Sequence, residues 1–105
     1  RDYTYVDDVT NYIFACYNKA KKLNNYFEIF NIGGENTIRI DKLVKIIAKN
    51  LNKKSKIRME KRNKLDPIKS LATNKKIKEF TKKKYNTPLI EGVNKCIESR
   101  LKMGL

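Results

Sequence analysis

The stretch Tyr26–Ile32, with the sequence YFEIFNI, decides the fold class that the sequence predicts. Phe27, Ile29 and their neighbours leave little of the apolar and polar alternation that is typical of a strand with one wet face. We therefore expect a strand that is covered on both faces, as in a parallel sheet. The GGEN that follows, residues 33–36, supplies a turn. Together with the helical patterns around it, this strand favours an α/β fold.

Shorter stretches are also predicted to be extended. RDYTYV, residues 1–6, is rich in tyrosine and β-branched side chains, which favour a strand. TIRI, residues 37–40, is a second short extended piece, and KIRME, residues 56–60, alternates as a brief strand. The stretch KRNKLDPIKS, residues 61–70, contains a proline and has no clear period, so we expect a loop there.

Apolar residues at helical spacing predict two helices in the first half of the chain. Asp7 or Asp8 is placed to cap the first helix, which runs to about Leu23. Its predicted buried stripe is formed by Val9, Ile13, Cys16 and Ala20. Asp41 is placed to cap the second helix. The buried stripe of that helix is formed by Leu43, Ile46, Ile47 and Leu51.

Two more helices are predicted in the second half. Thr73 or Asn74 caps a short, lysine-covered helix with only Ile77 and Phe80 on its inner side. Thr87 and Pro88 fit the N-cap and the first position of the last helix, which Gly104 ends. Its stripe is formed by Leu89, Val93, Cys96, Ile97 and Leu101.

Positive charge is concentrated in one part of the chain. Residues 42–84 hold 17 Lys and Arg against 3 acidic residues, while the remainder holds 8 of each, so this segment carries the whole net charge of +14. Such a segment is typical of a protein that binds nucleic acid or another polyanion. It also fits a bias toward AT-rich codons, because Lys, Asn and Ile make up 44 of 105 residues. The charge alone does not choose between these explanations.

Few residue patterns point to catalysis or metal binding. The chain has no histidine, and its two cysteines, Cys16 and Cys96, lack the spacing of a zinc site. Both fall on predicted apolar stripes, which suits reduced thiols in the cytoplasm. No apolar run reaches the roughly 18 residues of a membrane helix, and no signal peptide is visible. We therefore expect a cytoplasmic protein that does not bind metal.

The pair Tyr17 and Lys21 has the spacing of the catalytic Tyr-x-x-x-Lys of short-chain dehydrogenases. In those enzymes the lysine lowers the pKa of the tyrosine so that the phenolate acts as a base. Here the pair lies near the end of a helix, without a nucleotide-binding strand before it. Since the chain contains 6 Tyr and 20 Lys, the spacing arises easily by chance. We do not assign it a catalytic role.

Four blocks together resemble the carboxyl-terminal part of the NAD-dependent epimerase/dehydratase family. They are RDYTYVDDV, YFEIFNIGG, DKLVKIIAKNLNKKSKIRM and NTPLIEGVNKCIE. These extended short-chain dehydrogenases act on nucleotide sugars and include UDP-glucose 4-epimerase and UDP-glucuronate epimerase. The resemblance covers nearly the whole chain, and its first and last blocks are the most specific. It implies the last strands of a Rossmann-type sheet in residues 1–34 and the small substrate-binding lobe in residues 35–105.

The resemblance also implies particular substrate contacts. Arg1 matches the family arginine that contacts the diphosphate of the nucleotide sugar, and Asp66 aligns with an aspartate near the nucleotide. A second phosphate-facing arginine often precedes that aspartate, a role open to Arg62 or Arg58 with a shifted register. Other positions depart from the family: Leu65 and Pro67 flank Asp66, and KKKY, residues 82–85, stands where the family has Gly-Tyr-x-Pro. These departures lie in or next to the basic segment, residues 42–84.

Three functional hypotheses follow from the sequence. In the first, the chain is the substrate-binding part of a nucleotide-sugar epimerase or dehydratase, inactive alone because the NAD loop and the catalytic Tyr and Lys belong to a missing amino-terminal half. In the second, it is a small basic module that binds nucleic acid or other polyanions, although residues 42–84 contain a single aromatic residue, Phe80, for base stacking. The third is a non-functional remnant with an exposed sheet edge that aggregates.

Overall fold

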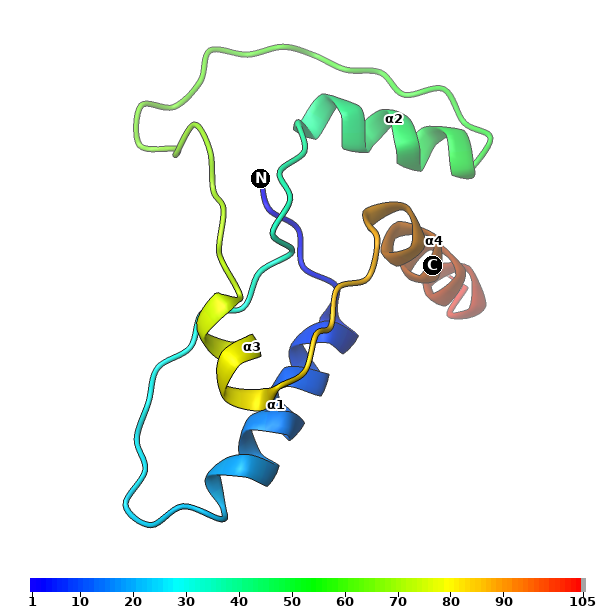
Figure 1. Ribbon diagram of the computed structural model, residues 1–105. Helices are drawn as coiled ribbons and strands as arrows, with labels where there is room; N and C mark the ends of the chain where they lie inside the picture. Colours follow the sequence, from blue (N-terminus) through cyan, green and yellow to red (C-terminus); the bar gives the residue numbers. More distant parts are fainter. Residues whose placement is uncertain (105) are drawn as a thin grey trace.

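The computed structural model describes residues 1–104, and helices are the regular secondary structure of this range. Figure 1 shows them in chain order: α1 (Val6–Ala20), α2 (Ile40–Asn50), α3 (Lys75–Thr81) and α4 (Leu89–Lys102). Within the described residues, strand pairing is limited to an isolated antiparallel bridge between Asp2 and Thr37. The chain is therefore all-helical. The predicted α/β fold, a fragment of a Rossmann-type sheet, is wrong.

The stretch Tyr26–Ile32 shows why that prediction failed. Its backbone is extended, but it lies outside any sheet. Tyr26 and Phe30 instead pack their rings on Phe80 of α3, with centroids 5.0 Å apart in both pairs. Phe27, which we expected to be covered, is 86% exposed. This stretch is held by aromatic packing on α3, without the inter-strand hydrogen bonds that define a strand.

Lysine contacts complete the docking of this extended stretch. Lys76 Nζ of α3 donates to Glu28 Oε1 at 2.6 Å and to the Ile29 carbonyl at 3.0 Å. The ion pair lowers the pKa of Glu28 below its ordinary value. The other predicted strands are also absent. Residues 56–60 are unpaired and exposed, and residues 1–6 contribute only Asp2 to the isolated bridge.

Helices α1 and α3 form a closed pair around a small core. Tyr12 of α1 and Ile77 of α3 are 0% and 1% exposed. The predicted stripe of α1 is rotated, because Ile13 is 56% exposed while Tyr12 is buried in its place. The Tyr12 hydroxyl accepts a hydrogen bond from the backbone N–H of Tyr85 at 3.2 Å, and the two rings meet edge to face. The hydrogen bond of the Tyr12 hydroxyl thus favours the orientation of α1 in which Tyr12 faces the core.

Asp8 fixes the start of α4. Its carboxylate accepts hydrogen bonds from the Thr87 backbone N–H at 2.7 Å and from the Thr87 hydroxyl at 2.9 Å. Thr87 is therefore not the N-cap that the sequence predicts. Pro88 takes that position, and the helix begins at Leu89.

Helices α2 and α4 form a second, open pair. No residue of α2 is buried, and Gly92 is the buried residue of α4, with the ring of Tyr5 against it. An exposed hydrogen bond of 2.7 Å joins Asn50 Nδ2 of α2 to Asn94 Oδ1 of α4. The predicted stripes of these helices face each other, but nothing among residues 1–104 closes over them.

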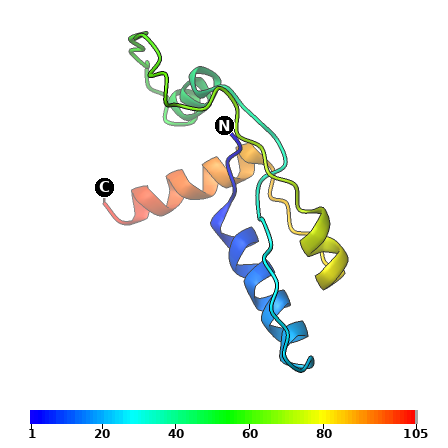
Figure 2. The ribbon, with the colours of Figure 1, turned by 90° about the vertical axis from the view of Figure 1, so that its left-hand side faces the viewer.

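The molecule is thin and exposes much surface. Its extents are 54 × 38 × 19 Å, so the shortest dimension is about two helix diameters. Its accessible surface of 8933 Å² exceeds the roughly 6,100 Å² of a compact protein of 12.4 kDa. Figure 2 shows α4 projecting away from the α1 and α3 pair. Large apolar faces are consequently left without cover.

Candidate functional site

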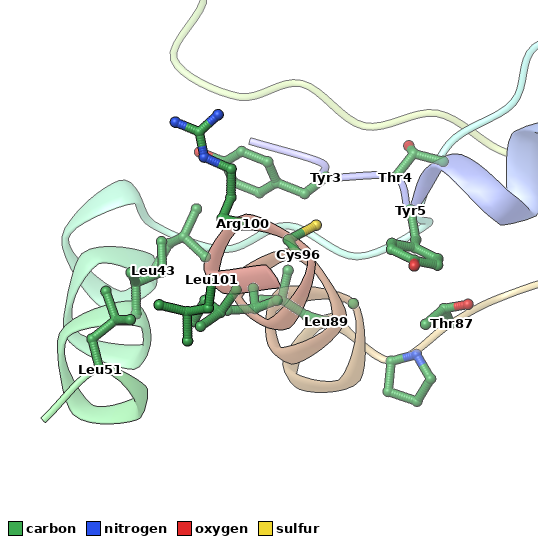
Figure 3. A pocket seen from close by; sticks show the side chains of 15 residues that line it. Tyr3, Thr4, Tyr5, Leu43, Leu51, Thr87, Leu89, Cys96, Arg100 and Leu101 are labelled. Carbon is green, nitrogen blue, oxygen red and sulfur yellow. The ribbon is translucent and has the colours of Figure 1, made fainter. Parts of the chain in front are cut away.

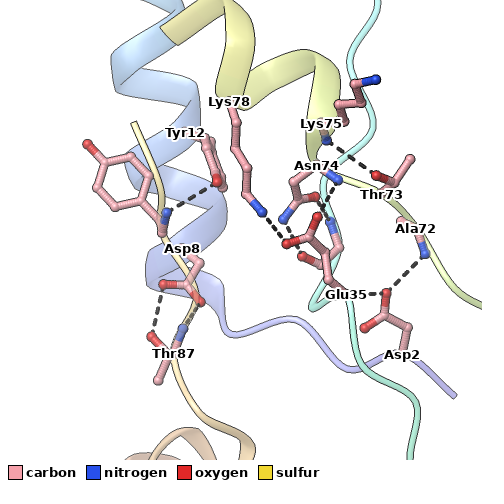
Figure 4. Close-up of polar contacts among 12 residues, drawn as sticks. Asp2, Asp8, Tyr12, Glu35, Ala72, Thr73, Asn74, Lys75, Lys78 and Thr87 are labelled. Atoms are coloured by element: carbon pink, nitrogen blue, oxygen red, sulfur yellow. Dashed lines mark hydrogen bonds and ion pairs between the residues drawn. The ribbon is translucent and has the colours of Figure 1, made fainter. Parts of the chain in front are cut away.

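The first residues of the chain are held by polar contacts to two distant segments. The backbones of Arg1 and Ile38 exchange two hydrogen bonds of 2.9 Å each. One carboxylate oxygen of Asp2 accepts hydrogen bonds from the Glu35 N–H at 3.2 Å and the Ala72 N–H at 3.1 Å. Figure 4 shows these contacts around Asp2. The position of Arg1 is therefore set by residues 35–38 and 72.

Asn74 links the glycine turn to the start of α3. It is 1% exposed, and its side-chain amide both accepts from the N–H of Gly33 and donates to the carbonyl of Gly33, at 2.8 Å in each case. Glu35 accepts a hydrogen bond from the Asn74 N–H at 2.9 Å and pairs with Lys78. These two contacts, the Lys78 bond first, lower the pKa of Glu35 below its ordinary value of 4.5. Asn74, predicted with Thr73 as a possible cap, does occupy the N-cap position of α3, but its amide binds Gly33 and makes no capping hydrogen bond.

The glycines of this turn permit close packing of the chain. A Cβ on Gly33 would lie 2.5 Å from Cβ of Ala72, and one on Gly34 would lie 2.2 Å from the carbonyl oxygen of Tyr3. Since the Gly33 N–H is already bound to Asn74, this turn does not offer the free amides of a phosphate cradle. The residues of this turn therefore do not fit the pyrophosphate of NAD.

The three predicted substrate-binding residues lie near one another. The guanidinium of Arg1 donates from NH1 to the carbonyl of Pro67, and that of Arg62 donates from NH1 to the carbonyl of Asp66. These acceptors belong to consecutive residues, whose Cα atoms are about 3.8 Å apart. Two guanidinium groups that are far apart in the sequence thus donate to neighbouring carbonyls of the turn that carries Asp66. Arg58, the other candidate, is 88% exposed and pairs with Glu60 at 3.1 Å.

Neither of the two guanidiniums is neutralised by a carboxylate. The ion pairs found among residues 1–104 use other cations: Arg39, Arg58, Lys76, Lys78 and Lys95. Arg1 is half-buried, whereas Arg62 and Asp66 are exposed. Each guanidinium uses one N–H group on a carbonyl and has four others available. The pair therefore has both the charge and the spare donors to bind an oxyanion.

Comparisons were made with family models, curated proteins and solved structures. None of them matches this chain. The proposed role of the site therefore depends on its own geometry and on the sequence resemblance.

The other candidates from the sequence take no part in this site. The Lys21 ammonium lies over the ring of Tyr17, 5.5 Å from its centroid, as a cation–π contact. Cys16 and Cys96 are free thiols, and burial raises the pKa of Cys16. In the described range no three His, Cys, Asp or Glu side chains are grouped closely enough to hold a metal ion, and no helix has the length and apolarity needed to cross a membrane.

Residues for which the sequence predicted no substrate-binding role support the site. Asp2, Glu35, Asn74 and Lys78 place Arg1 and the chain that follows the basic loop. The sequence gives part of this arrangement, since Gly33 and Gly34 indicate a turn at which two chain segments approach closely. Nothing in the sequence identifies Asn74 or Asp2 as the groups that approach.

Proposed function

We propose that this chain binds the diphosphate of a nucleotide sugar between Arg1 and Arg62. The observation that carries the proposal is the meeting of these guanidiniums at the carbonyls of Asp66 and Pro67, with no carboxylate on either. A guanidinium offers two parallel N–H donors that match the oxygens of a phosphate group. A diphosphate spans two such cations, one for each phosphate. The sequence resemblance supports the same residues.

Asp66 gives the site a second kind of contact. Its exposed carboxylate is free of ion pairs in the part of the chain that is described. An ionised carboxylate is an acceptor only, so it would accept from hydroxyl groups of a sugar and not from the phosphates. Two guanidiniums that bind phosphates and one carboxylate that binds hydroxyl groups are together complementary to a phosphorylated sugar, whereas a simple inorganic anion would use only the guanidiniums.

In this proposal the chain supplies substrate binding and not the chemistry. The hydride transfer of a nucleotide-sugar epimerase or dehydratase would use NAD and a catalytic Tyr and Lys that a partner, the amino-terminal half of such an enzyme, supplies in the cytoplasm. The exposed apolar side chains of the open molecule, such as Phe27 and Phe14 at 86% and 69%, offer surface for such a partner. Epimerisation and dehydration share this binding step.

Calorimetry with UDP-glucose, UDP and UMP tests the proposal. We expect UDP and UDP-glucose to bind, and UMP to bind about tenfold more weakly because it lacks the second phosphate. Arg1→Ala and Arg62→Gln should each weaken UDP binding about tenfold or more, since each removes charge-assisted hydrogen bonds. The Arg1 substitution leaves its backbone pairing with Ile38 in place.

Arg58→Gln is the matched control, because Arg58 lies in the same loop but is paired with Glu60. It should leave UDP affinity within about twofold. Equal losses in all three arginine variants would show a general charge effect and would contradict the proposed site. Unchanged affinity in Arg1→Ala would contradict the role of Arg1.

A second candidate function is binding of nucleic acid through the basic loop. All of residues 51–69 are exposed, and this loop carries eight of the cations of the basic segment on extended backbone. Figure 1 shows it arching away from the helices. An exposed basic loop of this kind contacts phosphates without reading bases.

Salt dependence separates the two functions. DNA binding by this loop should fall by about 0.9 log unit per log unit of salt for each phosphate contacted. Replacing Lys53, Lys54 and Lys56 with Gln should reduce that slope while leaving UDP affinity unchanged. Absence of DNA binding at low salt would rule out this second function.

A further inference from the structure

The open pair of helices encloses an apolar groove. Figure 3 shows α2 on the left and α4 beside it, and residues 3–5 line the groove on the side of α4 that faces away from α2 in this view. The α2 wall is made by Leu43, Ile47 and Leu51, and the α4 wall by Leu89, Val93, Ile97 and Leu101. Both sets have a four-residue spacing, which places each on one helix face. The groove has a volume of about 520 Å³, within the range of small-molecule sites.

The groove leaves α2 without the burial that a helix of its length needs. This helix has 11 residues, and none of them is buried. Helices of fewer than about 12 to 15 residues are marginal in water without tertiary packing. Apolar material placed in the groove would cover the stripe of α2 along its whole length, so binding there would stabilise the helix.

The charge in the groove is limited to one group. Of the 15 residues that line it, Arg100 alone is charged. Figure 3 shows its guanidinium at the rim, on the side of the Tyr3 ring. Arg100 lies in the last turn of α4 and takes part in none of the ion pairs of residues 1–104. A long apolar groove with one guanidinium at its rim is complementary to a ligand that has an apolar chain and an anionic end.

We propose that this groove binds a single-chain amphiphile with an oxyanion head, such as a medium-chain carboxylate. The alkyl chain lies between Ile47 of α2 and Val93 of α4, and the head accepts hydrogen bonds from Arg100 at the rim. The site is separate from Arg1 and Arg62, which do not line the groove. It therefore adds an apolar ligand to a chain whose proposed substrate is polar.

Binding of laurate, measured by calorimetry below its micelle concentration, tests this proposal. We expect saturable binding of one laurate per chain. Arg100→Gln should weaken it about tenfold or more, because the carboxylate loses its charged partner. Dodecanol, which has the same chain without the charge, should bind the native protein and Arg100→Gln equally. Circular dichroism should show a gain of helix on laurate addition, from α2.

Lys102→Gln is the matched control. Lys102 is exposed in the same last turn of α4 but does not line the groove, so its loss should change laurate affinity by less than about twofold. Val93→Phe places a larger side chain in the groove and should abolish binding while keeping the native fold by circular dichroism. Arg1→Ala should bind laurate normally, which separates this site from the proposed diphosphate site.

Three results would overturn the proposal. The first is absence of laurate binding. The second is an equal loss of affinity in Arg100→Gln and Lys102→Gln, which would show attraction to the net positive charge alone. The third is normal laurate binding by Val93→Phe, which would place the alkyl chain elsewhere. If vesicles that contain phosphatidylglycerol bind in an Arg100-dependent way while laurate does not, the ligand is a lipid surface and the proposal also fails.

Discussion

The two helix pairs of this protein differ in how they are held together. The α1 and α3 pair encloses fully buried side chains, Tyr12 and Ile77, and ties its loops to them through Asp8 and Asn74. The α2 and α4 pair has more regular apolar stripes but no buried residue in α2. A regular apolar stripe is therefore not enough to form a core. In the α1 and α3 pair, the side chains of Asp8 and Asn74 bind the backbone of distant loops and hold them against the helices. The α2 and α4 pair has no such side chains in the described residues.

The largest effect is expected from Gly34→Ala in the closed pair. The new Cβ would lie 2.2 Å from the Tyr3 carbonyl oxygen and 2.6 Å from the Asp2 carboxylate, so backbone has to move. We expect a loss of more than about 3 kcal/mol in the free energy of unfolding, measured by urea denaturation.

Gly92→Ala is the counterpart in the open pair. Its Cβ would meet only the side chain of Tyr5, at 3.2 Å, and alanine is the better helix former by about 1 kcal/mol. Its stability should stay within about 1 kcal/mol of the native protein. Equal losses in the two glycine variants would contradict the contrast between the pairs.

Asn74→Ala should cost about 2 kcal/mol, because it leaves the buried N–H and carbonyl of Gly33 without partners. The comparison is Asn50→Ala, which removes the exposed amide contact between α2 and α4. This second change should cost less than about 0.5 kcal/mol. Thermal denaturation of both variants measures the difference, and a larger loss in Asn50→Ala would reverse our ranking of the pairs.

A pH effect of about 1 kcal/mol is expected from Glu35. Its pKa is lowered in the folded protein by the Lys78 and Asn74 contacts, from an ordinary value of 4.5. A carboxyl with a lowered pKa stabilises the fold above its unfolded value, and the stabilisation is lost as the pH falls through the folded value. Stability measured between pH 6 and about 3 should therefore decline less in Glu35→Gln. An unchanged pH profile in that variant would contradict the role of the ion pair.

The smallest effect is expected from Lys82→Gly at the end of α3. Lys82 has a φ of 56°, in the left-handed region that favours glycine. We expect a gain of about 0.5 to 1 kcal/mol, measured by urea denaturation. A loss of stability would mean that the lysine side chain makes a contact worth more than the strain.

Local patterns in the sequence predicted all four helices, because apolar spacing acts over one or two turns. The predicted caps were wrong for three of them, since the N-cap positions of α1, α2 and α4 are Tyr5, Arg39 and Pro88. Local patterns failed for Tyr26–Ile32, since a strand exists only where another strand supplies its hydrogen bonds. They also put Ile13 on the inner face of α1 in place of Tyr12, because the pattern counts apolar side chains and the Tyr12 hydroxyl binds the Tyr85 N–H. The resemblance named Arg1, Arg62 and Asp66, and the structure places them near one another. The supporting contacts of Asp2 and Asn74 link distant positions that no local pattern contains.

The bonds of Asp8 to Thr87 also bear on how the chain folds. They join residues 79 positions apart, and the bond from Tyr85 to Tyr12 spans 73 positions. Contacts of such long sequence separation slow folding, because a large loop must close before they form. During synthesis α1 leaves the ribosome before Tyr85 and Thr87, because these partners lie later in the chain. The closed pair of α1 and α3 is the more stable half of the molecule, yet its contacts form only after residues 85–87 have been synthesised.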